Sequence, residues 1–171
     1  MNFFHLLLAH GNGHDLKVLP ESTRLINHNL IVLHPMIVHL PIGLLVTATL
    51  FEFLGLIVPK LKLNQTAYNI YIFGFFTALI ALVSGFLSDN LLGHGYRGHN
   101  IAHEHKNLMI IATIIWGFGT IIVWKMKTKL NEWTISFFII YLITASIFTL
   151  GANLGGELVY QFGVGVGSSQ K

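Results

Sequence analysis

Four long apolar segments, separated by short polar stretches, dominate the pattern along the chain. They run from about residue 35 to 58, 68 to 87, 108 to 124 and 133 to 154. A helix of roughly 20 mainly apolar residues can cross the hydrocarbon core of a membrane, and the third segment reaches this length when it is counted from His105. We therefore predict an all-α protein, a four-transmembrane-helix bundle with up-down connections.

Composition narrows the class of protein and the kinds of ligand it can offer. Of the 171 residues, 53% are hydrophobic and 10% are charged, whereas a soluble domain has roughly 25% charged residues. Cysteine is missing, which excludes disulfides, thiolate metal sites, iron–sulfur clusters and haem attached through a CxxCH motif. The net charge of +3 is small and scattered, so we expect contact with the lipid bilayer and no nucleic-acid partner.

Three parts are expected along the chain. Residues 1–33 form an N-terminal interfacial or flexible segment, residues 34–160 the four-helix membrane domain, and residues 161–171 a flexible C-terminal tail. Pro35 suits the first turn of a helix, because the N–H that proline lacks has no partner there in any case. The first membrane helix is therefore predicted to begin at Pro35, with His34 just outside it.

Lysine residues indicate the orientation in the membrane. The loops after the first and third segments hold five of them, namely Lys60, Lys62, Lys125, Lys127 and Lys129. The loop between the second and third segments holds only Arg97 and Lys106. By the positive-inside rule the lysine-rich loops face the cytoplasm. We therefore predict a multi-pass protein of the bacterial inner membrane with both termini on the outer side.

All ten histidines lie toward the predicted outer side. With alternating helices, the starts of the first and third segments and the ends of the second and fourth meet there. This brings together His34, His39, Asp89, His105 and Glu157. Ionisable side chains within a membrane are costly and mark functional sites. We interpret this group as the candidate site.

Helical geometry predicts which of these side chains point into the bundle. At 100° per residue, His39 shares a stripe with Gly43 and Thr47, and small residues beneath an imidazole leave room for a flat ligand. His103 lies about 200° from His105 on the same helix. His105 opens the apolar segment, so it is expected to face inward and His103 to lie on the surface.

Two imidazoles on facing helices, with small residues around them, are typical of axial haem ligation in a membrane bundle. We predict one b-type haem near the outer side, with His39 and His105 as iron ligands and His34 as the alternative ligand. Asp89 and Glu157 would support the cofactor. The protein would then be an electron-transfer subunit rather than a stand-alone enzyme, acting between a quinol and a periplasmic redox protein.

Two other functions stay open. His34, His39 and His105, with Asp89 or Glu157, have the donor types for a non-haem transition metal that is bound or transported. His105 does not belong to an HExxH motif, which argues against a metalloprotease. The third function is a cofactor-free structural or partner subunit of a membrane complex or a homo-oligomer.

Glu52 is the only acidic residue within the first apolar segment. It lies near the predicted cytoplasmic end, with Lys60 and Lys62 close in sequence. Two interpretations apply to it, a role in a proton relay and a structural ion pair at the membrane interface. We expect the side chain to reach the interface and pair with a lysine.

Several phrases of the chain resemble one known family. They are HPMIVHLPI at residues 34–42, Ser84-Gly85, His105, and the closing GGELVY and GVGV at residues 155–166. Together they look like a bacterial integral-membrane family catalogued as domain of unknown function 2231, over roughly residues 33 to 166. The layout is similar to small four-helix membrane b-type cytochromes, a resemblance that implies haem.

The predicted orientation can be tested by cysteine labelling. Ser169→Cys and His94→Cys should react with a membrane-impermeant maleimide added to the outside, and Thr128→Cys should not, because its lysine-rich loop faces the cytoplasm. Labelling at position 128 alone would overturn the orientation.

Overall fold

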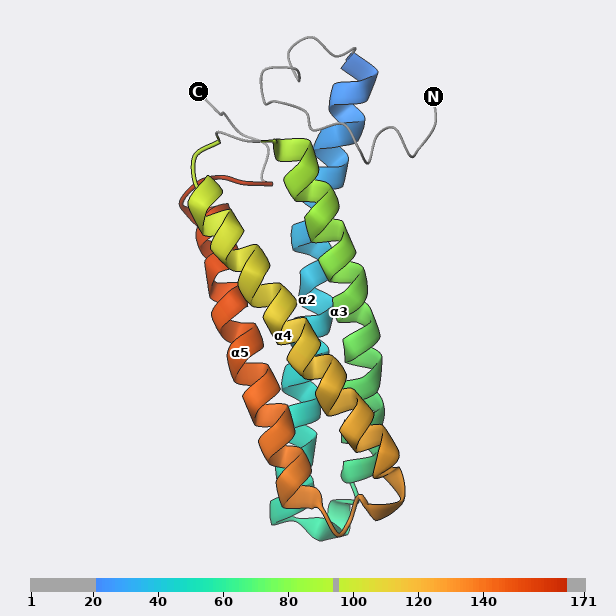
Figure 1. Ribbon diagram of the computed structural model, residues 1–171. Coiled ribbons are helices and arrows are strands. Elements are labelled where there is room, and N and C mark those ends of the chain that lie inside the picture. Colours follow the sequence, from blue (N-terminus) through green and yellow to red (C-terminus); the bar gives the residue numbers. More distant parts are fainter. Residues whose placement is uncertain (1–20, 94–95, 166–171) are drawn as a thin grey trace.

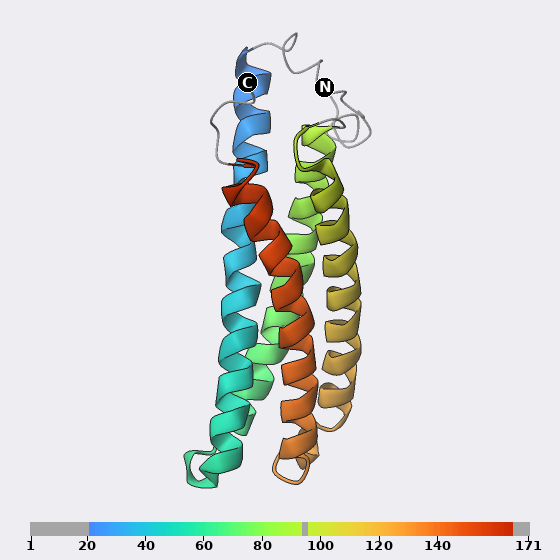
Figure 2. The same cartoon turned by 90° about the vertical axis from the view of Figure 1, so that its left-hand side faces the viewer.

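The structure is a computed structural model that describes residues 21–93 and 96–165, with side chains from residue 30 onward. The predicted N-terminal interfacial segment up to residue 20 and the end of the tail lie outside the described residues. Four long helices make up the described fold: α2 (Glu21–Ile57), α3 (Asn64–Leu92), α4 (His99–Lys125) and α5 (Thr134–Tyr160). They run alternately up and down around one bundle (Figures 1 and 2). The all-α, up-down prediction is confirmed.

Each helix is long and apolar enough to cross a membrane. Large apolar side chains cover the outside of the bundle, among them Met36, Phe73, Phe118, Ile135 and Leu150. So much exposed apolar surface would be a liability in water, and lipid tails solvate it without cost. The chain is a multi-pass membrane protein that contacts the lipid bilayer.

Short connections hold neighbouring helices antiparallel at the end of the bundle that carries the lysines. The 3-10 helix η2 (Pro59–Leu61) and Lys62, which adopts a left-handed φ of 51°, join α2 to α3. A second 3-10 helix, η3 (Lys127–Lys129), follows α4. We call this the lysine end, and the opposite end, where α3 ends and α4 begins, the histidine end.

Helix α2 begins earlier than predicted. It starts at Glu21 and continues through Pro35 and Pro41, so the predicted boundary at residue 34 lies inside a helix. In a membrane bundle, packing against neighbouring helices compensates for the backbone hydrogen bond that a proline removes. Here the closing phrase supplies part of that packing, because a Cβ on Gly165 would lie 3.2 Å from Cγ of Pro35.

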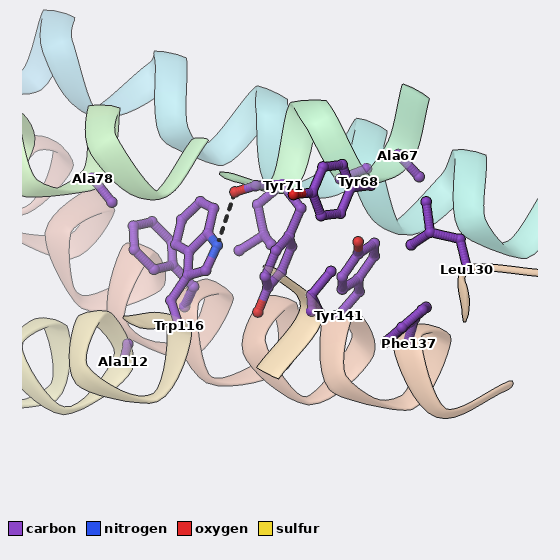
Figure 3. Close-up of a cluster of buried hydrophobic side chains, with 13 residues drawn as sticks. Ala67, Tyr68, Tyr71, Ala78, Ala112, Trp116, Leu130, Phe137 and Tyr141 are labelled. Carbon is purple, nitrogen blue, oxygen red and sulfur yellow. Dashed lines mark hydrogen bonds between the residues drawn. The ribbon is translucent and has the colours of Figure 1, made fainter. Parts of the chain in front are cut away.

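Aromatic side chains fill the centre of the bundle between α3, α4 and α5 (Figure 3). The rings of Tyr71 and Tyr141 stack with centroids 4.0 Å apart. The indole N–H of Trp116 donates to the carbonyl oxygen of Tyr71 over 3.2 Å, and the Tyr71 hydroxyl lies 2.9 Å from Oγ1 of Thr144. The two hydrogen bonds satisfy polar groups that lipid could not.

Glu52 does not reach the interface to pair with Lys60 or Lys62, so that prediction is wrong. Its side chain is fully buried, and its Oε1 accepts a hydrogen bond of 3.0 Å from Nδ2 of Asn64. Both lysines are exposed. Glu52 lies one helical turn after the buried Ala48, on the face of α2 that packs into the bundle, and this placement decides its environment.

Close packing of α3 against Trp116 can be tested with two glycines. A Cβ on Gly74 would lie 2.8 Å from Cζ2 of Trp116, whereas a Cβ on Gly43 would meet nothing within 4 Å. We expect Gly74→Ala to destabilise the fold by about 1–3 kcal/mol through overpacking. Gly43→Ala should instead be neutral or stabilising by up to about 1 kcal/mol. Thermal unfolding of both variants in one detergent measures the difference, and equal midpoints would contradict the packing.

Candidate functional site

The histidine end contains a cavity of about 280 Å³ between all four helices. His34 from α2, Asp89 from α3 and His105 from α4 line it. Small residues from α3, α4 and α5 complete the wall, namely Ala78, Ala81, Gly85, Ala102, Ala152 and Gly155. The predicted convergence of these helix ends is therefore present in the fold.

Two imidazoles face each other across this cavity. The ring centroids of His34 and His105 lie 6.4 Å apart, with their planes at 65°. Nδ1 of His34 lies 2.9 Å from Oγ of Ser84, and Nδ1 of His105 lies 2.8 Å from the carbonyl oxygen of Gly151. Each ring is thus anchored on a helix other than its own.

The hydrogen-bond network assigns the tautomer of both rings. A carbonyl oxygen can only accept, so Nδ1 of His105 carries the proton that it donates to Gly151. The hydroxyl of Ser84 already donates to the carbonyl oxygen of Ala81 over 2.7 Å, so Nδ1 of His34 must be the donor to Ser84. In both rings Nε2 is left with its lone pair, which is the form that binds a metal.

Glycines on α3 and α5 make room for the two rings. A Cβ on Gly85 would lie 3.0 Å from Cε1 of His34, and a Cβ on Gly155 would lie 3.0 Å from Cε1 of His105. These contacts are closer than side chains usually accept, so larger residues would displace the imidazoles. Glycine at positions 85 and 155 therefore provides the space that the two imidazole rings occupy.

His39 does not join the pair. Its side chain is exposed, as is Gly43 on the same stripe, and Thr47 is only partly buried. Nδ1 of His39 donates to the carbonyl oxygen of Pro35 over 2.6 Å. The prediction that this stripe faces the bundle is wrong, because the buried face of α2 runs through Pro41, Leu45 and Ala48. His39 borders the cavity from the lipid side.

The inward position predicted for His105 is confirmed. Its ring lines the cavity, whereas His103 is exposed on the same helix and lies 3.1 Å from Nδ2 of Asn107. The side chains of His5, His10, His14, His28 and His94 lie outside the described residues.

Asp89 forms an ion pair with Lys106, a residue that was not predicted to belong to the site. Its Oδ2 lies 2.7 Å from Nζ of Lys106 in an ion pair, and both residues line the cavity together with Tyr96. Burial, followed by the negative charge of Asp89, raises the pKa of Tyr96 to about 12. The rim of the cavity therefore carries one ion pair and one neutral hydroxyl.

Glu157 takes no part in the imidazole contacts. It is half-buried on α5, and its neighbours Gly156 and Leu158 line the cavity while Glu157 does not. Within residues 30–93 and 96–165, no three His, Asp or Glu side chains gather to hold a metal ion. The structure therefore does not assemble the predicted set of three histidines and a carboxylate.

The closing phrase folds back over the histidine end. Gly163 adopts a left-handed φ of 68°, and the N–H of Val164 donates to the carbonyl oxygen of Leu158 over 3.0 Å. Val164 and Gly165 then line the cavity. The first residues of the predicted tail thus form part of the site.

Comparison with known proteins gives one match. A family model described as "Predicted membrane protein (DUF2231)" matches residues 30–168, which include the membrane-crossing parts of all four helices and the closing phrase. No curated protein and no solved structure matches the chain. The resemblance to this family that was noted in the sequence is confirmed.

Proposed function

The chain belongs to the DUF2231 family of predicted membrane proteins, and we propose that it is a b-type haem protein that transfers electrons in the bacterial inner membrane. His34 and His105 are the proposed axial ligands. The observation that carries the proposal is the convergence of these two imidazoles from different helices, each with Nδ1 anchored and Nε2 left to bind.

The spacing of the rings suits one metal between them. With bonds of roughly 2 Å from each imidazole nitrogen to the metal, two rings that would hold one ion can have centroids about 6 Å apart. The observed separation is 6.4 Å. The cavity volume of about 280 Å³ lies just below the roughly 300–1,000 Å³ found for cofactor pockets.

The number of protein ligands favours haem over a bare ion. A structural zinc site takes four ligands, and a catalytic one takes three from the protein. The described residues offer no such group of three. A porphyrin supplies four nitrogen ligands of its own, so two ligands from the protein would complete the set. His34 and His105 would be these two ligands.

The remaining residues would position the ligands. When bound, the haem supplies one-electron redox chemistry. Ser84 and Gly151 hold the imidazoles in the binding tautomer, and such partners also increase the basicity of the ligand. Gly85 and Gly155 leave space for the rings, and the ion pair of Lys106 with Asp89 adds polar groups at the rim.

A quinol is the proposed electron donor and a periplasmic redox protein the acceptor. The positive-inside rule would put the lysine end in the cytoplasm and the site near the periplasm. His39 stands on the lipid side of the cavity, and its Nδ1 is already bonded. Its Nε2 is therefore suited to accept a hydroxyl proton from a quinol in the bilayer.

Replacing single histidines tests the proposal. The purified protein should show a Soret band of low-spin haem that shifts on reduction. His34→Ala or His105→Ala should each abolish the low-spin spectrum, because each removes one axial ligand. His39→Ala is the matched control and should retain it. Absorption spectra with and without dithionite provide the measurement.

A further variant distinguishes the proposed iron ligand His34 from Ser84, which only positions it. Ser84→Ala keeps both imidazoles but removes the partner of His34, so it should lower haem occupancy or shift the potential without abolishing the low-spin spectrum. A wild-type protein without haem, or a spectrum lost in His39→Ala and kept in His34→Ala, would contradict the assignment.

A further inference from the structure

Glu52 is a fully buried carboxyl group that the histidine site does not use. Its Oε1 accepts the hydrogen bond from Asn64, while its Oε2 is buried with no hydrogen-bond partner among the described residues. A buried polar atom that lacks a partner is unfavourable, because it has lost its hydrogen bonds to water. Such an atom in a membrane core calls for a functional explanation.

The groups around Glu52 are polar but carry no positive charge. Tyr141 on α5 lies close enough to Glu52 to interact with it electrostatically. Its fully buried hydroxyl also lacks a hydrogen-bond partner among the described residues. Tyr68 and Tyr71 on α3 pack in one core cluster with Tyr141. Helix α4 has no titratable residue between Lys106 and Lys125, and in the described part of the chain the one ion pair joins Lys106 to Asp89.

A charged carboxylate without a cation nearby would be strongly unfavourable in these surroundings. Glu52 can avoid this cost by holding a proton. A protonated carboxyl is also a hydrogen-bond donor, which gives it a second way to interact with its neighbours. The site therefore has the properties of a proton store and not those of an ion pair.

Asn64 connects Glu52 to the lysine end. It belongs to the wall of a second cavity of about 1,040 Å³, whose other lining residues include Lys62, Gln65 and Lys129. The side chain of Asn64 donates to Glu52 inside the bundle. A Cβ on Gly55 would lie 2.8 Å from Oδ1 of Asn64, so glycine at position 55 lets Asn64 occupy this place.

We propose that Glu52 is a proton-binding site within the membrane, loaded from the lysine-end cavity past Asn64, with Tyr141 as the next polar group inward. A hydronium ion gives one proton to the carboxylate and leaves as water, and release is the reverse. The proposal does not depend on haem at the histidine end. It differs from a structural Glu52–Asn64 hydrogen bond, because a proton store must exchange its proton with solvent.

Infrared spectroscopy of the protein in lipid nanodiscs tests the exchange. The wild type should show a C=O stretching band of a protonated carboxyl at neutral pH, and transfer to D₂O should shift the band to lower frequency. Glu52→Gln should lose this band. Glu132→Gln, which changes an exposed glutamate at the same end, should keep it.

Two variants test the route past Asn64. Gly55→Ala should displace Asn64, and Asn64→Leu should replace its amide with an apolar group, so both should slow the shift in D₂O. A band that exchanges at the wild-type rate in both variants would overturn the proposed route.

A chemical probe makes the test independent of variant folding. Dicyclohexylcarbodiimide reacts with protonated carboxyl groups in apolar surroundings, so mass spectrometry of the treated wild type should find the adduct on Glu52. A wild type with no protonated carboxyl band and no adduct, or a band that does not exchange in D₂O, would overturn the proposal. None of these outcomes depends on haem content.

Discussion

The absence of water from the membrane core is the constraint on which the rest of this structure depends. A polar group placed there is costly unless it finds a partner within the protein. His34 finds Ser84, His105 finds the carbonyl oxygen of Gly151, and Trp116 finds that of Tyr71. Each bond crosses from one helix to another, so the same contacts that satisfy the polar groups also fix how the helices pack.

The fold was largely predictable, because apolar runs of membrane length and short loops leave few ways to arrange four helices. The start of α2 was not. Pro35 carries the signal of a first helical turn, yet the helix begins at Glu21. In water an internal proline usually ends or kinks a helix, whereas packing within a membrane bundle lets it persist. Local sequence could not reveal the contact between Pro35 and the distant Gly165.

The position of the site in the bundle could be predicted from the sequence, but some of the residues that form it could not. The angle between His103 and His105 correctly indicated which faces inward. On α2, small residues beneath His39 suggested the wrong face, although the spacing of Pro41, Leu45, Ala48 and Glu52 marks the buried one. This spacing did not indicate the buried face in advance, because Glu52 was expected to lie at the surface. Lys106 and Tyr96 joined the site through tertiary contacts that no local pattern records, and haem as the ligand stays a prediction.

Whether His34 and His105 bind one iron through Nε2 is tested most directly by electron paramagnetic resonance of the oxidised protein. The signal of low-spin ferric haem depends on the axial ligands and on the angle between their planes. Two imidazoles whose planes cross near 65° predict a strongly anisotropic low-spin signal. A high-spin signal, the signal of a histidine–methionine pair, or the absence of any haem signal would contradict the account.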